Sequence, residues 1–166
     1  NLFKEILCSV VDDIVAMMKR VNETNATGLQ KLRQVYDAYI DICVRNQDLV
    51  MSIQRELARG SKADGAVVPT VHRDILERFA PAGAVLREIA AQMKRDGVLK
   101  EYGEDGDSLI SPMVMTFAAA VGSLVHLYRG SPDFARLRDL FWQILMHGIL
   151  REDVSKNLLE MEDEHS

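Results

Sequence analysis

The side chains best suited to bind a small molecule lie on the segment that ends at Arg45. Tyr36 and Tyr39 are three residues apart, and Cys43 follows Tyr39 by one helical turn. A tyrosine offers an apolar ring and one hydrogen-bonding hydroxyl, which suits a mostly apolar pocket with few polar anchors. The same residues fit ordinary core packing with hydroxyls that reach the surface, and the sequence leaves both interpretations open.

Apolar side chains on other segments could complete such a pocket. Phe79 lies beside Pro81, which removes a helical hydrogen bond and is expected to bend the helix and leave space. Methionines add an adaptable surface, although a methionine stripe is more often part of a core. The predicted pocket is lined by Met17, Tyr36, Tyr39, Cys43, Phe79, Met93, Met113 and Phe117.

Metal and catalytic chemistry find little support in the sequence. His126 and His147 lack a carboxylate or cysteine at ligand spacing, which favours packing or hydrogen bonding over a metal site. The motif Glu162-x-x-His165 matches half of a di-iron site but occurs once, near the C-terminus. The sequence has no glycine-rich phosphate loop and no nucleophile elbow. We therefore predict that the protein is not an enzyme and needs no cofactor or metal.

Two adjacent apolar helices are predicted over residues 111–150. Ser111-Pro112 and Ser131-Pro132 each combine a serine N-cap with a proline at the first helical position. The first helix has no formally charged residue up to Tyr128, and the second is apolar over more than half its surface. One subunit can cover one face of each helix but hardly both.

The first of these helices has a side with almost no side-chain bulk, where another helix could approach closely. Two copies would then form a four-helix bundle about a two-fold axis, which makes a homodimer the favoured interpretation. The alternative is that both helices form the buried centre of a monomer, and for Trp142 a core role is comparably favoured. The predicted interface comprises Met115, Ala118, Ala119, Gly122, His126, Leu137, Phe141, Trp142 and Leu145.

The rest of the chain also has the helical period. Apolar residues recur at spacings of three and four over residues 2–21, and Thr27 with Gln30 forms a capping-box pattern for a helix that ends at Arg45–Asn46. A short third helix follows Asp48, and a long fourth spans residues 69–96, where Gly97 stops it. The predicted fold is all-α with six main helices in one domain, residues 1–150, followed by an acidic and frayed helical tail, residues 151–166.

Composition limits the classes of partner. The 166 residues carry a net charge of −5, so this chain lacks the basic footprint of a nucleic-acid-binding surface. No apolar run is long enough to span a membrane, and no signal peptide is visible. Cys8 and Cys43 have no metal-type spacing and are predicted to be reduced, buried thiols in a cytoplasmic protein. Because Asn1 is not a methionine and the helical pattern begins at once, we expect a further segment upstream.

The order of these segments resembles the C-terminal part of TetR-type transcriptional regulators. Residues 2–7, Leu-Phe-Lys-Glu-Ile-Leu, resemble the first helix after the DNA-binding head of that family. Residues 45–49 with Glu56-Leu57 resemble its short-helix join, and residues 94–99 resemble the turn before its long dimer helix. Residues 140–149 resemble its last helix. The resemblance covers residues 2–150, but the helix-turn-helix head is absent from this chain.

This resemblance implies a ligand-sensing and dimerisation domain. A small hydrophobic effector would enter an apolar cavity enclosed by the first, second, fourth and fifth helices and shift the first helix. Operator DNA would be bound only through the missing N-terminal head, and a preference of a few kcal/mol for one arrangement suffices to couple the two events. The alternative is a stand-alone helical protein-interaction module without ligand or DNA function.

Overall fold

The computed structural model describes residues 2–49, 70–101 and 133–163, and between the last two ranges residues 110, 112–114, 116, 120–121, 124, 128 and 131. Its helices are α1 (Leu2–Asn22), α2 (Gly28–Arg45), α4 (Thr70–Arg95), α6 (Asp133–Ile149) and α7 (Glu152–Asp163). Within these ranges the only extended pairing is the isolated bridge between Leu99 and Leu150. The structure is therefore all-α, as predicted. Most of the predicted third helix lies outside the described residues, although residues 47–49 are helical.

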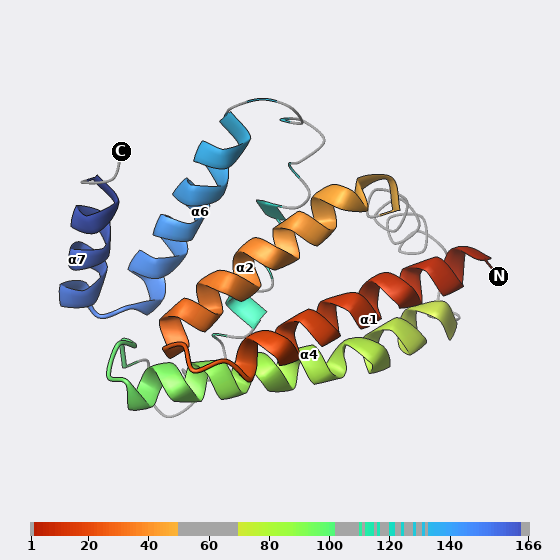
Figure 1. Cartoon of the computed structure of the whole chain (residues 1–166), viewed down its shortest axis with the longest axis horizontal. Helices are drawn as coiled ribbons and strands as arrows, with labels where there is room; N and C mark the ends of the chain where they lie inside the picture. Colours follow the sequence, from red (N-terminus) through yellow and green to blue (C-terminus); the bar gives the residue numbers. More distant parts are fainter. Residues whose placement is uncertain are drawn as a thin grey trace, which may run out of the picture.

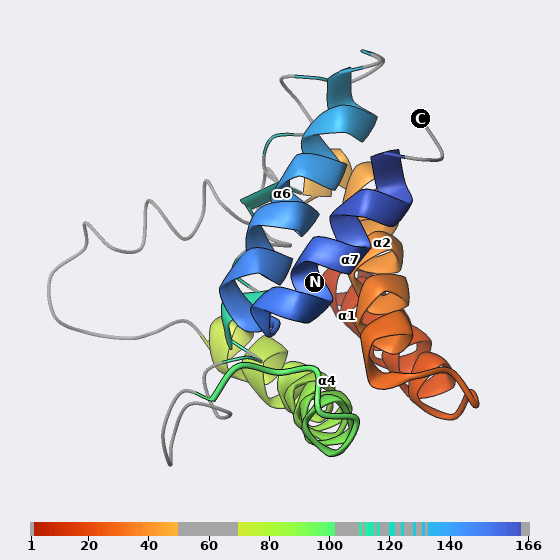
Figure 2. The ribbon, with the colours of Figure 1, turned by 90° about the vertical axis from the view of Figure 1, so that its left-hand side faces the viewer.

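The helices form two groups (Figure 1). Helices α1 and α4 run side by side in the same direction over most of their length, and α2 returns across them in the opposite direction. Figure 2 shows α6 and α7 as an antiparallel pair, and α6 of this pair contacts α2. The core lies between the two groups, and its largest fully buried side chains are Met18, Leu32, Tyr36, Ile40, Leu86, Ile89, Met93, Ile110, Leu145, Met146, Ile149 and Leu150.

The start of α2 confirms the predicted capping box. The Gln30 amide donates to Thr27 Oγ1 at 3.3 Å, and the Thr27 amide donates to Gln30 Oε1 at 3.0 Å. These two bonds satisfy backbone donors that the first turn of a helix leaves without partners. The start of α2 is therefore fixed by residues within four positions of one another.

Helices α2 and α4 approach closely at Gly28. A Cβ placed on Gly28 would lie 2.7 Å from Met93 Cγ and 2.8 Å from the Met93 backbone nitrogen. The Gly28 amide also donates to Asp96 Oδ2 at 3.2 Å. Because only glycine lacks a Cβ, no other residue fits this crossing without movement of α4.

Helix α4 ends as predicted, and it continues through its proline. Gly97 follows the last turn with φ of +73°, the left-handed conformation that glycine adopts without strain. Pro81 lies inside the helix, which runs unbroken from Thr70 to Arg95. Proline has no amide hydrogen, so the carbonyl of Glu77 loses its usual helical partner there.

The loops at one end of the molecule are joined by backbone hydrogen bonds. The Lys100 amide donates to the Ile149 carbonyl at 2.9 Å, and the Arg151 amide donates to the Val98 carbonyl at 3.0 Å. This pairing fixes the position at which α7 begins. Helix α7 covers most of the segment predicted as a frayed tail, and Val154 and Leu158 on it pack against the core.

Candidate functional site

Tyr36 joins α2 to α6 inside the core. Its side chain is completely buried, and its hydroxyl donates to the carbonyl oxygen of Arg138 at 3.0 Å. The ring lies 5.2 Å from that of Trp142, centroid to centroid, at an interplanar angle of 48°. Desolvation by burial raises the pKa of Tyr36, so the phenol stays neutral and can act only through its hydrogen bond and its apolar ring.

Next to Tyr36, a half-buried cluster of charges links the same two helices. Arg33 binds Asp37 at 2.7 Å and Asp139 at 2.8 Å, and its guanidinium carbon lies 5.0 Å above the Trp142 ring. The second oxygen of Asp37 lies 3.7 Å from Arg138 Nε, and neither of these buried atoms has a hydrogen-bond partner. The arrangement holds Trp142 between an aromatic ring and a cation, which orients α6 relative to α2.

Tyr39 and Cys43 are one helical turn apart on α2, on nearly the same side of the helix as Tyr36. Burial, followed by the neighbouring thiol, raises the pKa of Tyr39. Burial also raises the pKa of the Cys43 thiol from 9.0 to about 11, although the hydroxyl opposes the shift. The thiol is therefore protonated near neutral pH and is a poor nucleophile. The pair offers a ligand one weakly polar point in apolar surroundings.

The other predicted pocket residues lie around the same core on three helices. Met17 on α1 and Met93 on α4 are buried, and Met93 packs onto Gly28. Phe79 and Met113 are partly buried and pack against the core cluster. Phe117 lies outside the described residues. The structure thus places the described members around one core, and their role in binding stays a prediction.

An open groove lies between α1 and α2. Its volume is about 500 Å³, and we call it the α1–α2 groove; it is lined by Asp13, Met17, Arg20, Ala38, Asp41, Ile42, Arg45 and Asn46. Met17 and Ile42 form its buried apolar floor, and the charged side chains stand at its rim. Of the predicted pocket residues described here, Met17 lines this groove.

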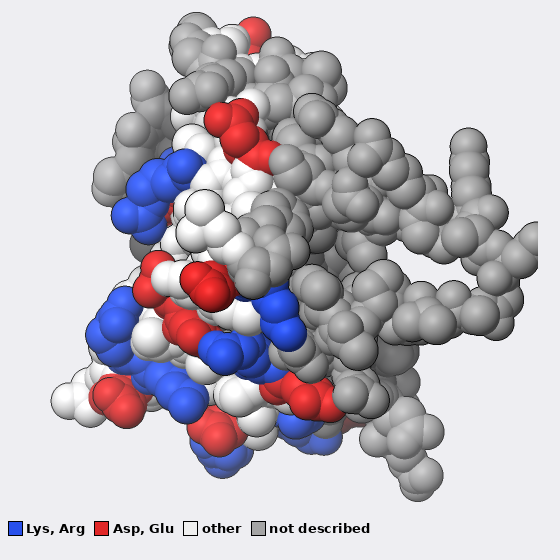
Figure 3. Space-filling view, turned by 90° about the vertical axis from the view of Figure 1, so that its right-hand side faces the viewer, with Lys and Arg blue, Asp and Glu red and all other residues white. Residues whose placement is uncertain are grey.

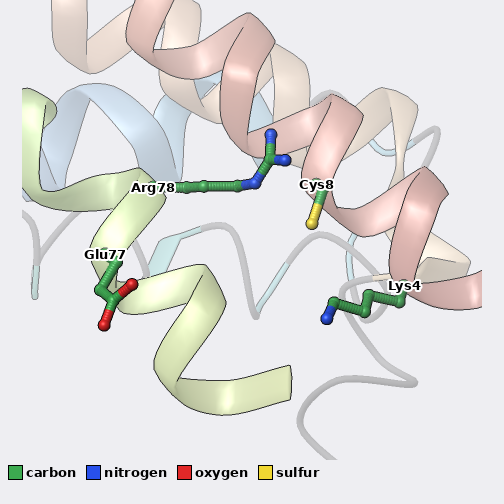
Figure 4. Close-up of a pocket in the computed structure, with 4 residues that line it drawn as sticks. All are labelled: Lys4, Cys8, Glu77 and Arg78. Atoms are coloured by element: carbon green, nitrogen blue, oxygen red, sulfur yellow. The ribbon is translucent and has the colours of Figure 1, made fainter. Parts of the chain in front are cut away.

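A second hollow, of about 380 Å³, lies between the first half of α1 and the Pro81 region of α4. Figure 4 shows its four lining residues, of which Cys8 extends from α1 and Arg78 reaches across from α4. Arg78 binds Asp12 on α1 at 2.7 Å. This exposed ion pair closes one side of the hollow and links the two helices.

Helix α6 has two apolar faces. Trp142, Leu145 and Met146 are buried within the chain. On the other side, Leu140 is 49% exposed and Ile144 is 50% exposed. The half-buried Leu137 and Phe141 lie on the same side as this exposed pair, at spacings of three and four residues. We call Leu137, Leu140, Phe141 and Ile144 the α6 stripe.

The helical segment before α6, within residues 110–128, also contributes to the predicted interface. Thr116 and Ala120 are exposed and helical, whereas Val114 and Val121 are buried. One side of this segment therefore packs into the core, and its exposed positions include the small Thr116 and Ala120 and the larger Tyr128. The remaining predicted interface residues lie outside the described part of the chain: Met115, Ala118, Ala119, Gly122 and His126.

Figure 3 shows that one side of the molecule carries acidic and basic side chains interspersed, without a region of a single sign among the described residues. Of the described helices, none combines the length and the apolar character needed to cross a bilayer.

Sequence reasoning missed two sets of residues. Leu140 and Ile144 belong to the exposed stripe, and their spacing from Leu137 and Phe141 was a visible signal. The Arg33–Asp139 pair joins residues 106 positions apart, for which one sequence contains no local signal.

Comparisons with known proteins agree with the fold. No family model and no curated protein sequence matches this chain. Its structure is similar to that of the ketosteroid transcriptional regulator KstR2 of Mycobacterium tuberculosis, with a TM-score of 0.68 and 18% sequence identity. The alignment covers 90% of this chain and 72% of that one. At this identity the likeness concerns the fold, and it confirms the all-α, TetR-like fold class predicted from the sequence.

Proposed function

We propose that this chain is the effector-sensing and homodimerisation domain of a TetR-type transcriptional regulator. The observation that carries the proposal is the α6 stripe, an exposed apolar surface on a helix whose opposite face is already buried. Exposed contiguous apolar surface of this kind marks association sites in soluble proteins. The likeness in fold to a transcriptional regulator supports the same assignment.

The proposed dimer pairs α6 and the preceding helix with their copies about a two-fold axis. Leu140 and Ile144 would lie at its centre, flanked by Leu137 and Phe141. Trp142 and Leu145 are 2% and 1% exposed within one chain. In the proposed dimer they would therefore pack inside their own subunit, behind the stripe, and would not contact the partner. The small exposed residues Thr116 and Ala120 would let the second helix pair approach.

The dimer is tested with a charge placed on the stripe. Ile144→Glu should weaken self-association at least about a hundredfold, because the new carboxylate would be buried without a partner. The matched control is Ala135→Glu, which adds the same charge to an exposed position of α6 outside the stripe. Sedimentation velocity over a concentration series measures both. Equal dissociation of the two variants, or of neither, would count against the proposed interface.

The proposed effector is a small, mostly apolar molecule held near Tyr39 and Cys43. Ketone-bearing steroids belong among the candidates, because the similar regulator is described as a ketosteroid regulator. Binding would change the position of α1, to which a DNA-binding head would be joined upstream. Leu2 is 72% exposed and Ile6 46% exposed, so this end of α1 presents apolar surface that such a head would cover.

The proposed effector binding is tested by thermal stabilisation of the chain in a panel of apolar small molecules, steroid ketones included. A bound effector should raise the melting temperature in proportion to the logarithm of its concentration. Tyr39→Phe should reduce that stabilisation, whereas Tyr128→Phe on the exposed surface should not. A chain that dimerises through α6 but binds no member of the panel would favour the alternative of a helical interaction module.

A further inference from the structure

We propose that the α1–α2 groove is a separate binding site for a small organic anion with an apolar tail, such as a medium-chain carboxylate. This proposal does not depend on the proposed regulatory function. Ala38 in the groove and Tyr36 in the core are two residues apart on α2, which places them on nearly opposite sides of the helix. The groove is therefore distinct from the interior around the tyrosines.

The floor of the groove suits an alkyl chain. Met17 and Ile42 are only 8% and 6% exposed, and the half-buried Ala38 lies between their two helices. The volume of about 500 Å³ lies within the range of small-molecule sites in proteins. A methionine adapts its shape to a flexible chain better than a branched side chain does.

The rim determines which charge the ligand should carry. Asp41 already faces Arg138 at 3.9 Å. Throughout the described ranges, Arg20, Arg45 and Asp13 have neither a hydrogen-bond partner nor an ion-pair partner. Two free guanidinium groups thus outnumber one free carboxylate. A guanidinium presents a planar fork of donors that matches a carboxylate, so the unused binding capacity of the rim favours an anion.

The first experiment titrates the full chain with octanoate, octylammonium and 1-octanol, which share one tail and differ in charge. Ligands of this size bind open grooves with roughly millimolar affinity, so titration calorimetry to about 5 mM is required. Octanoate should bind at least about tenfold more tightly than 1-octanol. Octylammonium should bind no better than the alcohol. Equal binding of the cation and the anion, or no binding of octanoate, would overturn the proposal.

The second experiment locates the site. The double variant Arg20→Gln/Arg45→Gln should weaken octanoate binding about tenfold or more, because it removes both free guanidinium groups of the rim. The matched control, Arg87→Gln/Arg136→Gln, makes the same change in net charge at exposed positions of α4 and α6. If both double variants bind octanoate like the unmodified chain, the anion occupies another site and the proposal fails, whereas the proposed effector site is unaffected.

The third experiment places a larger side chain inside the groove. Ala38→Leu places an isobutyl group in the groove without disturbing the rim, and leucine is a good helix former. Octanoate binding should be lost while circular dichroism and the melting temperature stay close to those of the unmodified chain. Undiminished binding to this folded variant would show that the alkyl chain lies elsewhere and would contradict the proposal.

Discussion

Tyr36 is a residue that links the two groups of helices inside the core. Its ring supports Trp142, its hydroxyl bonds to the backbone of Arg138, and both partners belong to α6. Arg33 and Asp37 on the same helix contact Asp139, Arg138 and Trp142, on the side of α6 that Tyr36 also contacts. This one side chain therefore fixes both the depth and the rotation of α6.

The contribution of the Tyr36 hydroxyl can be measured with Tyr36→Phe, which keeps the ring. A single buried hydrogen bond contributes about 1 kcal/mol to stability, so the melting temperature should fall by about 2–4 °C. Tyr128→Phe is the matched control, because Tyr128 is 38% exposed. Urea unfolding of the two variants provides the comparison. A Tyr36→Phe protein as stable as the Tyr128→Phe protein would contradict the role given to the hydroxyl.

The raised pKa of Cys43 predicts how stability depends on pH. The folded state keeps the thiol proton to about pH 11, whereas the unfolded state loses it near pH 9. Because the folded state binds more protons in this window, the free energy of unfolding should fall as pH rises from about 9 to about 11. Below pH 9 the stabilisation is fully present.

The measurement compares the chain with Cys43→Ala by urea unfolding at pH 8 and at pH 10.5. Between these values the unmodified chain should lose up to about 2 kcal/mol more than the variant, since one pKa unit corresponds to 1.36 kcal/mol. The tyrosines of the core titrate later and remain in both proteins. Parallel pH profiles for the two proteins would show that Cys43 is not held protonated by the fold.

At the scale of elements, the crossing of α2 and α4 depends on the absence of a side chain at Gly28. Gly28→Ala should destabilise the chain by about 2–3 kcal/mol, because the new methyl group meets the Met93 backbone nitrogen at 2.8 Å and the backbone cannot rotate away. Thermal and urea unfolding measure the effect.

Gly83 provides the control for Gly28. It lies inside α4, and the nearest atom to its added Cβ would be the end of the Arg87 side chain at 3.6 Å. Gly83→Ala should therefore stabilise the chain by about 0.5–1 kcal/mol through helix propensity. If both variants change stability equally, the crossing is not limited by close approach at Gly28.

The boundaries of elements could be predicted where the signal is local. The Thr27 capping box and the Gly97 stop each depend on residues within a few positions of one another, so the sequence alone determined them. One long helix was predicted across Pro81, and α4 runs through it from Thr70 to Arg95; the bend expected at the proline stays a prediction.

The orientation of α6 could not be predicted from the sequence in the same way. Both of its faces are apolar, so helical periodicity does not say which one enters the core. The choice depends on Arg33 and Tyr36, which lie about a hundred residues earlier and select Trp142 for burial. The sequence identified the helix and its apolar character, but it did not identify Leu140 and Ile144 as the exposed centre.

In the whole molecule, some of the described helices enclose the core and another carries the exposed apolar stripe. Helices α1, α2 and α4 enclose a core with two tyrosines and one thiol, and α6 presents the stripe on the outside. The loops after α4 and α6 are joined by backbone hydrogen bonds, which fix α6 at one end of the other helices.

In the proposed dimer, the α6 stripe is covered by a second copy of the chain. Light scattering coupled to gel filtration at micromolar concentration measures the molar mass directly. We expect a mass of about 37 kDa, twice the 18.7 kDa of one chain. A mass of 18.7 kDa at all concentrations up to the limit of solubility would contradict it.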